Sequence, residues 1–217
     1  MWISVSQTSF MIKNLFPIKR PFYVREQRTS MLFLQYEWEK TIMLKSQDCI
    51  ILIKLLANPN VAWSQRQLAK ALCISLSEVN AGIRRLGMVA LLRKNKQGRL
   101  FPNHDLTQEF LISAIKFFFP AKLGEYTRGI PTGIAAKIFQ DKIAVDDDPI
   151  TVWPDAYGEK KGVELPPLHP SIPKALRETP DQSFYELLVL IDVIRVGRAR
   201  ERNMAIALLK ERLKNDK

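Results

Sequence analysis

Residues 64–99, SQRQLAKALCISLSEVNAGIRRLGMVALLRKNKQGR, contain two helix-start signals that lie 11 residues apart. Ser64 is followed three residues later by Gln67, and Ser75 is followed at the same distance by Glu78. This is the spacing of a capping box, in which the hydroxyl accepts a backbone N–H and the later side chain reaches back. We therefore expect two short helices joined by a tight turn, which is helix-turn-helix spacing.

The second of these helices has an apolar side and a polar side. The residues predicted to face a core follow helical spacing: Leu76, Val79, Ile83 and Leu86. The residues predicted on the opposite side, with Asn80 at its flank, are Ser77, Ala81, Arg84 and Arg85. Small polar groups and guanidinium groups on an exposed helix face suit the reading of base edges in the major groove.

A basic β-hairpin is predicted directly after this helix. Residues 89–92 can form a strand, residues 94–99 a tight turn and residues 100–101 the returning strand. The cations at its tip are Lys94, Lys96 and Arg99. They suit contacts with the phosphate backbone or the minor groove.

These features together resemble the winged helix-turn-helix regulators of bacteria, the MarR-like group in particular, over roughly residues 46–101. The matching residues are Leu68-Ala69, Ile74-Ser75, Ser77-Glu78-Val79, Arg85-Leu86 and Ala90-Leu91-Leu92. The chain departs from the family pattern at Cys73, where Gly is usual, and at Ala81, where Arg is frequent. The resemblance implies binding to double-stranded DNA, with the following predicted contacts: Ser75, Ser77, Asn80, Ala81, Arg84, Arg85, Lys94, Lys96 and Arg99.

The distribution of charge points to the same segment. The 217-residue chain carries a net charge of +11. Residues 43–104 hold ten Lys and Arg against Asp48 and Glu78, a net charge of +8, whereas residues 105–217 hold 17 charges of each sign. A concentrated basic surface favours a polyanionic partner.

Three regions follow from these patterns: an N-terminal extension (1–42), the winged helix-turn-helix domain (43–104) and a helical or mixed C-terminal region (105–217). The extension shows no sustained period, and Met31 or Met43 could be the working start. The alternative is an arm that packs on the domain or contacts DNA through Lys19, Arg20, Arg25 and Arg28. Within the DNA-binding domain, a first helix is expected at 46–57, capped by Ser46 and ended by Asn58-Pro59.

The C-terminal region begins with an expected helix from Asp105 to Phe119. Nine of the 13 prolines fall within 120–180, together with a candidate short helix after Thr132. Residues 150–153 and 162–165 are candidate strands of a hairpin. This middle segment could be a small subdomain or an extended stretch that wraps over the domain. The predicted fold is mainly α with a small β wing, a Pro/Gly-rich middle segment and C-terminal helices.

Two further helices are expected at 182–196 and 198–213. The first is apolar on two sides, with Leu187, Leu188 and Ile191 on one and Leu190, Val193 and Ile194 on the other. Such a helix must be covered on both sides, either by this chain or by a partner. Because paired DNA half-sites require two-fold symmetry, we expect a homodimer. The four arginines of 195–202 are either a solvated face or an anion contact.

No catalytic constellation is visible. Trp153-Pro154-Asp155 is interpreted as a strand end and turn, and neither His104 nor His169 has a Cys or a carboxylate at zinc-ligand spacing. We therefore predict no enzyme activity, no metal and no cofactor. Two reduced cysteines and the lack of an apolar run of about 18 residues favour a cytoplasmic protein that does not enter a membrane.

The predicted function is that of a sequence-specific DNA-binding transcriptional regulator acting as a dimer. The alternative is a protein-interaction module, such as an antitoxin-type regulator that binds a partner protein through residues 105–217. Steep salt dependence of DNA binding distinguishes the first from the second.

Overall fold

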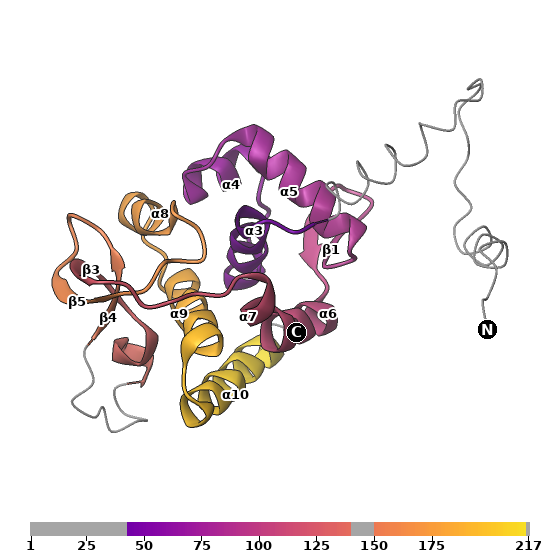
Figure 1. The fold of residues 1–217 in the computed structure, drawn as a ribbon. Coiled ribbons are helices and arrows are strands. Elements are labelled where there is room, and N and C mark those ends of the chain that lie inside the picture. Colours follow the sequence, from indigo (N-terminus) through magenta and orange to yellow (C-terminus); the bar gives the residue numbers. More distant parts are fainter. Residues whose placement is uncertain (1–42, 140–149, 216–217) are drawn as a thin grey trace, which may run out of the picture. The chain divides into compact units, whose positions relative to one another are not determined.

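The computed structural model describes residues 43–139 and 150–215, so the predicted extension (1–42) lies outside the described residues. The helices are α3 (Ser46–Ala57), α4 (Gln65–Leu72), α5 (Leu76–Met88), α6 (His104–Glu109), α7 (Ile115–Phe118), α8 (Ile172–Glu178), α9 (Gln182–Val196) and α10 (Ala199–Asn215). The strands are β1 (Leu92–Lys94), β2 (Leu100–Pro102), β3 (Tyr126–Thr132), β4 (Thr151–Pro154) and β5 (Lys160–Glu164). The expectation of a mainly helical chain with a small β component is confirmed (Figure 1).

Helix α3 has the predicted span but a different cap. Its N-cap is Lys45 rather than Ser46, because the Asp48 carboxylate accepts the Lys45 backbone N–H at 2.8 Å. All residues from Asp48 to Leu56 are buried, so the helix has no side that faces solvent along this stretch. It packs against α4, α5, α9 and β2.

Both predicted capping boxes are confirmed. The Ser64 hydroxyl accepts the Gln67 backbone N–H, and the Gln67 side chain accepts the Ser64 N–H at 2.9 Å. Between α4 and α5, Cys73 adopts the left-handed conformation with φ 52°. A residue with a Cβ costs about 1–2 kcal/mol in this conformation; Gly would avoid the cost.

The buried face of α5 begins one turn later than predicted. Val79, Ile83 and Leu86 are buried, but Leu76, the first residue of the helix, is 40% exposed. Gly82 lies on the side facing α3, where a Cβ would come within 2.7 Å of the Ile51 Cδ1 atom. Glycine is a poor helix former, yet at this position the close packing of the two helices requires it.

The hairpin after α5 exists, but its first strand begins later in the sequence than the predicted 89–92. Ala90 has φ 59° and turns the chain, so β1 begins only at Leu92. The strands pair antiparallel, with Arg93 opposite Phe101.

The described residues contain no helix long and apolar enough to cross a bilayer.

The helix expected from Asp105 to Phe119 has three parts. Helix α6 leads into a π-helical turn, Phe110–Ala114, and then α7. The Ile115 N–H donates to the Phe110 carbonyl five residues back, which defines the wider turn. Leu111 and Ile115 are buried, whereas Phe118 is 56% exposed.

The Pro/Gly-rich middle segment forms a small sheet that closes on itself. Strand β3 pairs antiparallel with both β4 and β5. The predicted strands exist, but the predicted hairpin is wrong, because β4 and β5 run parallel where they pair. The segment between β4 and β5 passes so close to β3 that small residues are needed at the contact. A Cβ at Gly158 would lie 2.4 Å from the Gly129 Cα atom. In place of the short helix after Thr132 the chain makes two 3-10 turns, Gly133–Ala135 and Lys137–Phe139.

Both C-terminal helices are confirmed, and α9 is central to the core. Its residues from Leu187 to Ile194 are all buried, and it packs against α3, α7 and α10 of the same chain. The two apolar sides of α9 are therefore covered from within the chain. One core runs from α3 to α10, across the boundary expected at residue 104.

A buried ion pair fastens α9 to α3. The Lys54 ammonium lies 2.8 Å from the Oδ2 atom of Asp181. The other carboxylate oxygen of Asp181, Oδ1, accepts the Phe184 N–H and so caps α9. Partial burial alone would raise the pKa of Asp181. The hydrogen bonds from Lys54, Phe184 and Asn58 outweigh this effect and hold that pKa below its ordinary value.

This lowered pKa gives a pH-dependent stability. The stabilisation from Asp181 is complete above the pKa of the unfolded carboxyl, about 3.9, and is lost as the pH falls through the lower folded pKa. At pH 7, Asp181→Asn should lower the free energy of unfolding by about 1.5–3 kcal/mol. Urea unfolding of both proteins at pH 7 and near pH 3 tests this, and an equal difference at the two pH values would contradict it.

Candidate nucleic-acid interface

The outer face of α5 carries most of the side chains predicted on it. Ser77, Asn80 and Arg84 are exposed, and Ala81 is half-buried. The side chains point outward because the opposite face of α5 packs on α3. These four residues are available to a ligand that lies along the helix.

Ser75 is exposed but already engaged as the cap of α5. Its hydroxyl lies 2.7 Å from a Glu78 carboxylate oxygen and accepts the Glu78 backbone N–H at 3.2 Å. The hydrogen bonds from Ser75 hold the pKa of Glu78 below its ordinary value. Ser75 therefore determines where the helix begins, and a DNA contact would have to share its hydroxyl.

A groove of about 350 Å³ lies between α5 and the hairpin. It is lined by Asn80 and Arg84 of α5, by Arg93 and Lys94 of β1, and by Gln65 in the first turn of α4. The fold thus brings together three residues predicted to bind DNA, although up to 14 positions separate them in sequence. Three cationic side chains around one groove create a local positive potential.

Arg93 and Gln65 were not among the residues predicted from the sequence to bind DNA. The signal for Arg93 was its position in the strand. Successive side chains of a strand point to opposite faces, so the neighbour of the buried Leu92 points to the outer face. Gln65 follows the Ser64 cap, and the first turn of a helix presents backbone N–H groups that favour anions. Gln65 lies outside α5 and the hairpin tip, the two elements on which the DNA contacts were predicted.

The hairpin tip is shaped by Asn95. Its side-chain oxygen accepts the backbone N–H groups of Gln97 at 3.0 Å and Arg99 at 2.8 Å. Gly98 has φ 79°, which suits a residue without a Cβ. Lys94 and Lys96 are both exposed beside this turn.

Arg99 does not extend from the tip in the way that Lys94 and Lys96 do. Its guanidinium donates to the Pro59 carbonyl at 2.6 Å and lies 5.0 Å from the centre of the Phe101 ring. Arg99 is half-buried as a result. Arg99 thus joins the hairpin to the segment that follows α3. A phosphate contact of Arg99, as predicted, would be made in addition to this structural role.

The prediction that Arg85 faces outward is wrong. Arg85 is 7% exposed, and its guanidinium makes two hydrogen bonds of 2.7 and 2.6 Å to the buried Asp48 carboxylate. These bonds raise the pKa of Arg85. The absence of a side chain at Gly82 leaves the space that Asp48 occupies, since a Cβ there would lie 2.8 Å from the Asp48 Oδ1 atom. Arg85 is therefore removed from the candidate interface.

Most of the predicted positive charge nevertheless lies on the surface. Of the ten Lys and Arg within 43–104, Lys54 and Arg85 are buried in ion pairs and Arg99 is half-buried. The exposed ones are Lys45, Arg66, Lys70, Arg84, Arg93, Lys94 and Lys96. Asp48 is itself buried, so little negative charge opposes them there.

Among residues 43–139 and 150–215, no three His, Cys, Asp or Glu side chains lie together as a metal-binding group. Compared with protein-family models, with characterised proteins and with solved structures, the chain gives no match.

Proposed function

We propose that this chain is a cytoplasmic, sequence-specific DNA-binding transcriptional regulator of the winged helix-turn-helix, MarR-like type that acts as a dimer. The observation that carries the proposal is the groove shared by α5 and the hairpin, with Asn80, Arg84, Arg93 and Lys94 around it. An exposed polar helix beside a cationic hairpin is the arrangement that a winged helix presents to a duplex.

The proposal assigns a role to each exposed side chain. In the major groove, Asn80 and Arg84 hydrogen-bond to base edges, with Ser77 and Ala81 beside them. Arg pairs best with guanine and Asn with adenine, and the Ala81 methyl suits the methyl group of thymine. From the hairpin, Arg93, Lys94 and Lys96 bind the flanking phosphates.

Arg84→Ala should weaken binding to the preferred site by about 1–3 kcal/mol and relax its sequence preference. Lys96→Ala should instead weaken binding to all duplexes alike, because a phosphate contact carries no sequence information. The preferred site is first selected from random duplex DNA, and both variants are then titrated against it by fluorescence anisotropy. Because Arg84 and Lys96 are exposed, the thermal melt of each variant serves as the folding control. Unchanged affinity of Arg84→Ala for the selected site would remove α5 from the reading role.

The salt dependence separates this function from the protein-interaction alternative. If five or more phosphates are contacted, the DNA affinity should fall steeply between about 50 and 200 mM salt. A protein that binds no duplex even at low salt, yet binds a protein partner tightly through 105–217, would overturn the proposal in favour of the interaction module.

A further inference from the structure

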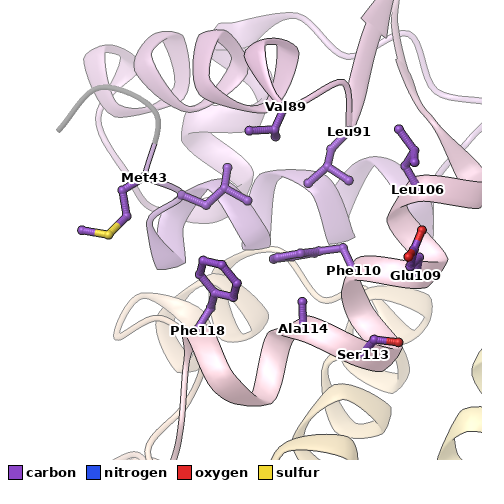
Figure 2. Close-up of a pocket in the computed structure, with 10 residues that line it drawn as sticks. Met43, Val89, Leu91, Leu106, Glu109, Phe110, Ser113, Ala114 and Phe118 are labelled. Atoms are coloured by element: carbon purple, nitrogen blue, oxygen red, sulfur yellow. The ribbon is translucent and has the colours of Figure 1, made fainter. Parts of the chain in front are cut away.

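Exposed apolar side chains gather around one groove, which is lined by residues just before α3 (Met43 and Leu44), just after α5 (Val89 and Leu91) and in the α6–α7 segment. Figure 2 shows Leu91, Phe110 and Phe118 directed into this groove, which has a volume of about 670 Å³. Three of its lining side chains, Met43, Leu106 and Phe118, are 66%, 39% and 56% exposed. Exposed apolar patches of this kind mark interaction sites.

The π-helical turn sorts the side chains of this segment into two rows. Residues at intervals of four line the groove: Leu106, Phe110, Ala114 and Phe118. The wider turn brings Phe110 and Phe118 within 6.2 Å, ring centre to ring centre, although they are eight residues apart. In an uninterrupted α-helix, residue 117 would lie nearest to the direction of Phe110. Instead, Phe117 is turned outward and is 73% exposed.

The second row consists of Glu109, Ser113 and Phe117, all exposed. Glu109 is the one charged residue among the described residues that line the groove. At the other end of the row, the Lys116 ammonium lies 4.7 Å from the centre of the Phe117 ring. The row thus has the negative Glu109 at one end and the aromatic Phe117, with Lys116 next to it in sequence, at the other, and both end residues are four positions from the small side chain of Ser113.

A row with this pattern is complementary to itself when reversed. A two-fold axis through Ser113 sets two copies antiparallel and brings each negative end against the positive end of the other. Such pairing of one surface with itself is the isologous contact of a cyclic dimer. Within the part of the chain that the structure describes, α9 and α10 offer no comparable surface, since α9 is covered by its own chain and Ala205, Leu209 and Leu213 of α10 are buried.

We propose that a second copy of this chain occupies this groove, with the 104–118 segments of the two protomers packed antiparallel about Ser113. Glu109 faces the partner's Lys116, and Phe117 covers the exposed apolar side chains around the partner's groove. The inference deepens the dimer of the proposed function. It is tested without DNA, so that its failure can be distinguished from a failure of DNA binding.

The first test is the mass of the full chain in solution, measured by sedimentation velocity over a range of concentrations. Phe117→Glu should weaken dimerisation about 30-fold or more, the effect expected of an interface hot spot. Tyr126→Glu is the matched control: Tyr126 is an aromatic residue that is 67% exposed on β3, outside this surface, and the variant should dimerise normally. A full chain that stays monomeric at high micromolar concentration overturns the inference, as does a dimer that Phe117→Glu leaves intact.

Charge reversal tests the orientation. Glu109→Lys should weaken the dimer by placing two cations together, and adding Lys116→Glu should restore it by exchanging the two ends of the row. Failure of the double variant to recover, with both variants folded by circular dichroism, contradicts the antiparallel register.

Cross-linking tests the axis and does not depend on weakening the dimer. In a Cys73→Ser background, Ser113→Cys should form a disulfide between protomers on mild oxidation, because residues on a two-fold axis meet their own copies within about 7 Å. Phe117→Cys should not, since its own copy lies at the far end of the row. Cross-linking of Phe117→Cys but not Ser113→Cys overturns the proposed geometry. A dimer formed through another surface that still binds DNA overturns this inference alone.

Discussion

Arg85→Ala is expected to lower the free energy of unfolding by about 3–5 kcal/mol, the cost of breaking a buried ion pair by removing one partner. The variant leaves the Asp48 carboxylate fully buried without the two hydrogen bonds of 2.7 and 2.6 Å that it accepts from the guanidinium. The loss is measured by urea unfolding at pH 7 and a fixed protein concentration.

The neighbouring Arg84→Ala is a matched control, because it removes the same kind of side chain from an exposed position one residue away. We expect it to change stability by no more than about 0.5 kcal/mol while it impairs DNA binding. The comparison of the two variants thus separates an effect on protein stability from an effect on DNA recognition. Equal stability losses for the two variants would contradict the assignment of Arg85 to the core.

Asp192→Ala should destabilise the fold by a similar amount, about 3–5 kcal/mol. One carboxylate oxygen of Asp192 accepts the Trp153 indole N–H at 2.6 Å and the Thr132 hydroxyl at 2.9 Å. The other oxygen accepts the Arg195 guanidinium at 2.7 Å. Removing the carboxylate leaves the buried indole and hydroxyl donors without this acceptor and the buried guanidinium without its counter-charge. The near-ultraviolet circular dichroism of the buried Trp153 provides a second readout of the same loss.

A double-mutant cycle tests whether Asp192 joins α9 to the small β-sheet. Trp153→Phe removes the indole donor, so its effect and that of Asp192→Ala should be non-additive by about 0.5–3 kcal/mol. Asp192→Asn should fall between wild type and Asp192→Ala, since an amide oxygen can still accept the indole N–H. Strictly additive losses would show that the two side chains do not stabilise the fold jointly.

Local sequence signals predicted the local structure well. The capping boxes that begin α4 and α5, the tight turn between these helices and the hairpin after them depend on residues within a few positions of one another. Hydrophobic spacing also located α3, α9 and α10 to within one or two residues of their observed ends. At the candidate interface, the same reasoning placed Asn80, Arg84 and Lys94 correctly on the surface.

The errors arose where a distant residue decides the outcome. Arg85 looked like a surface residue because its counter-charge, Asp48, lies 37 positions earlier. The parallel pairing of β4 and β5 depends on β3, which pairs antiparallel with each of them. The hairpin prediction did not include this third strand. The π-helical turn changes the direction of Phe117 and Phe118 without any Gly or Pro in 110–118 to signal it.

The burial of α3 on every side limits how the DNA-binding region can be isolated. A fragment cut to residues 43–104 would lack α9 and would expose the face of α3 that α9 covers. The uncovered sequence of α3, IILIKLL at 50–56, combines strong hydrophobicity with β-branched residues and a single charge, the composition of aggregation-prone segments. If such a fragment is insoluble, the reason would be that α9 no longer covers α3. A minimal soluble DNA-binding fragment therefore has to retain α9.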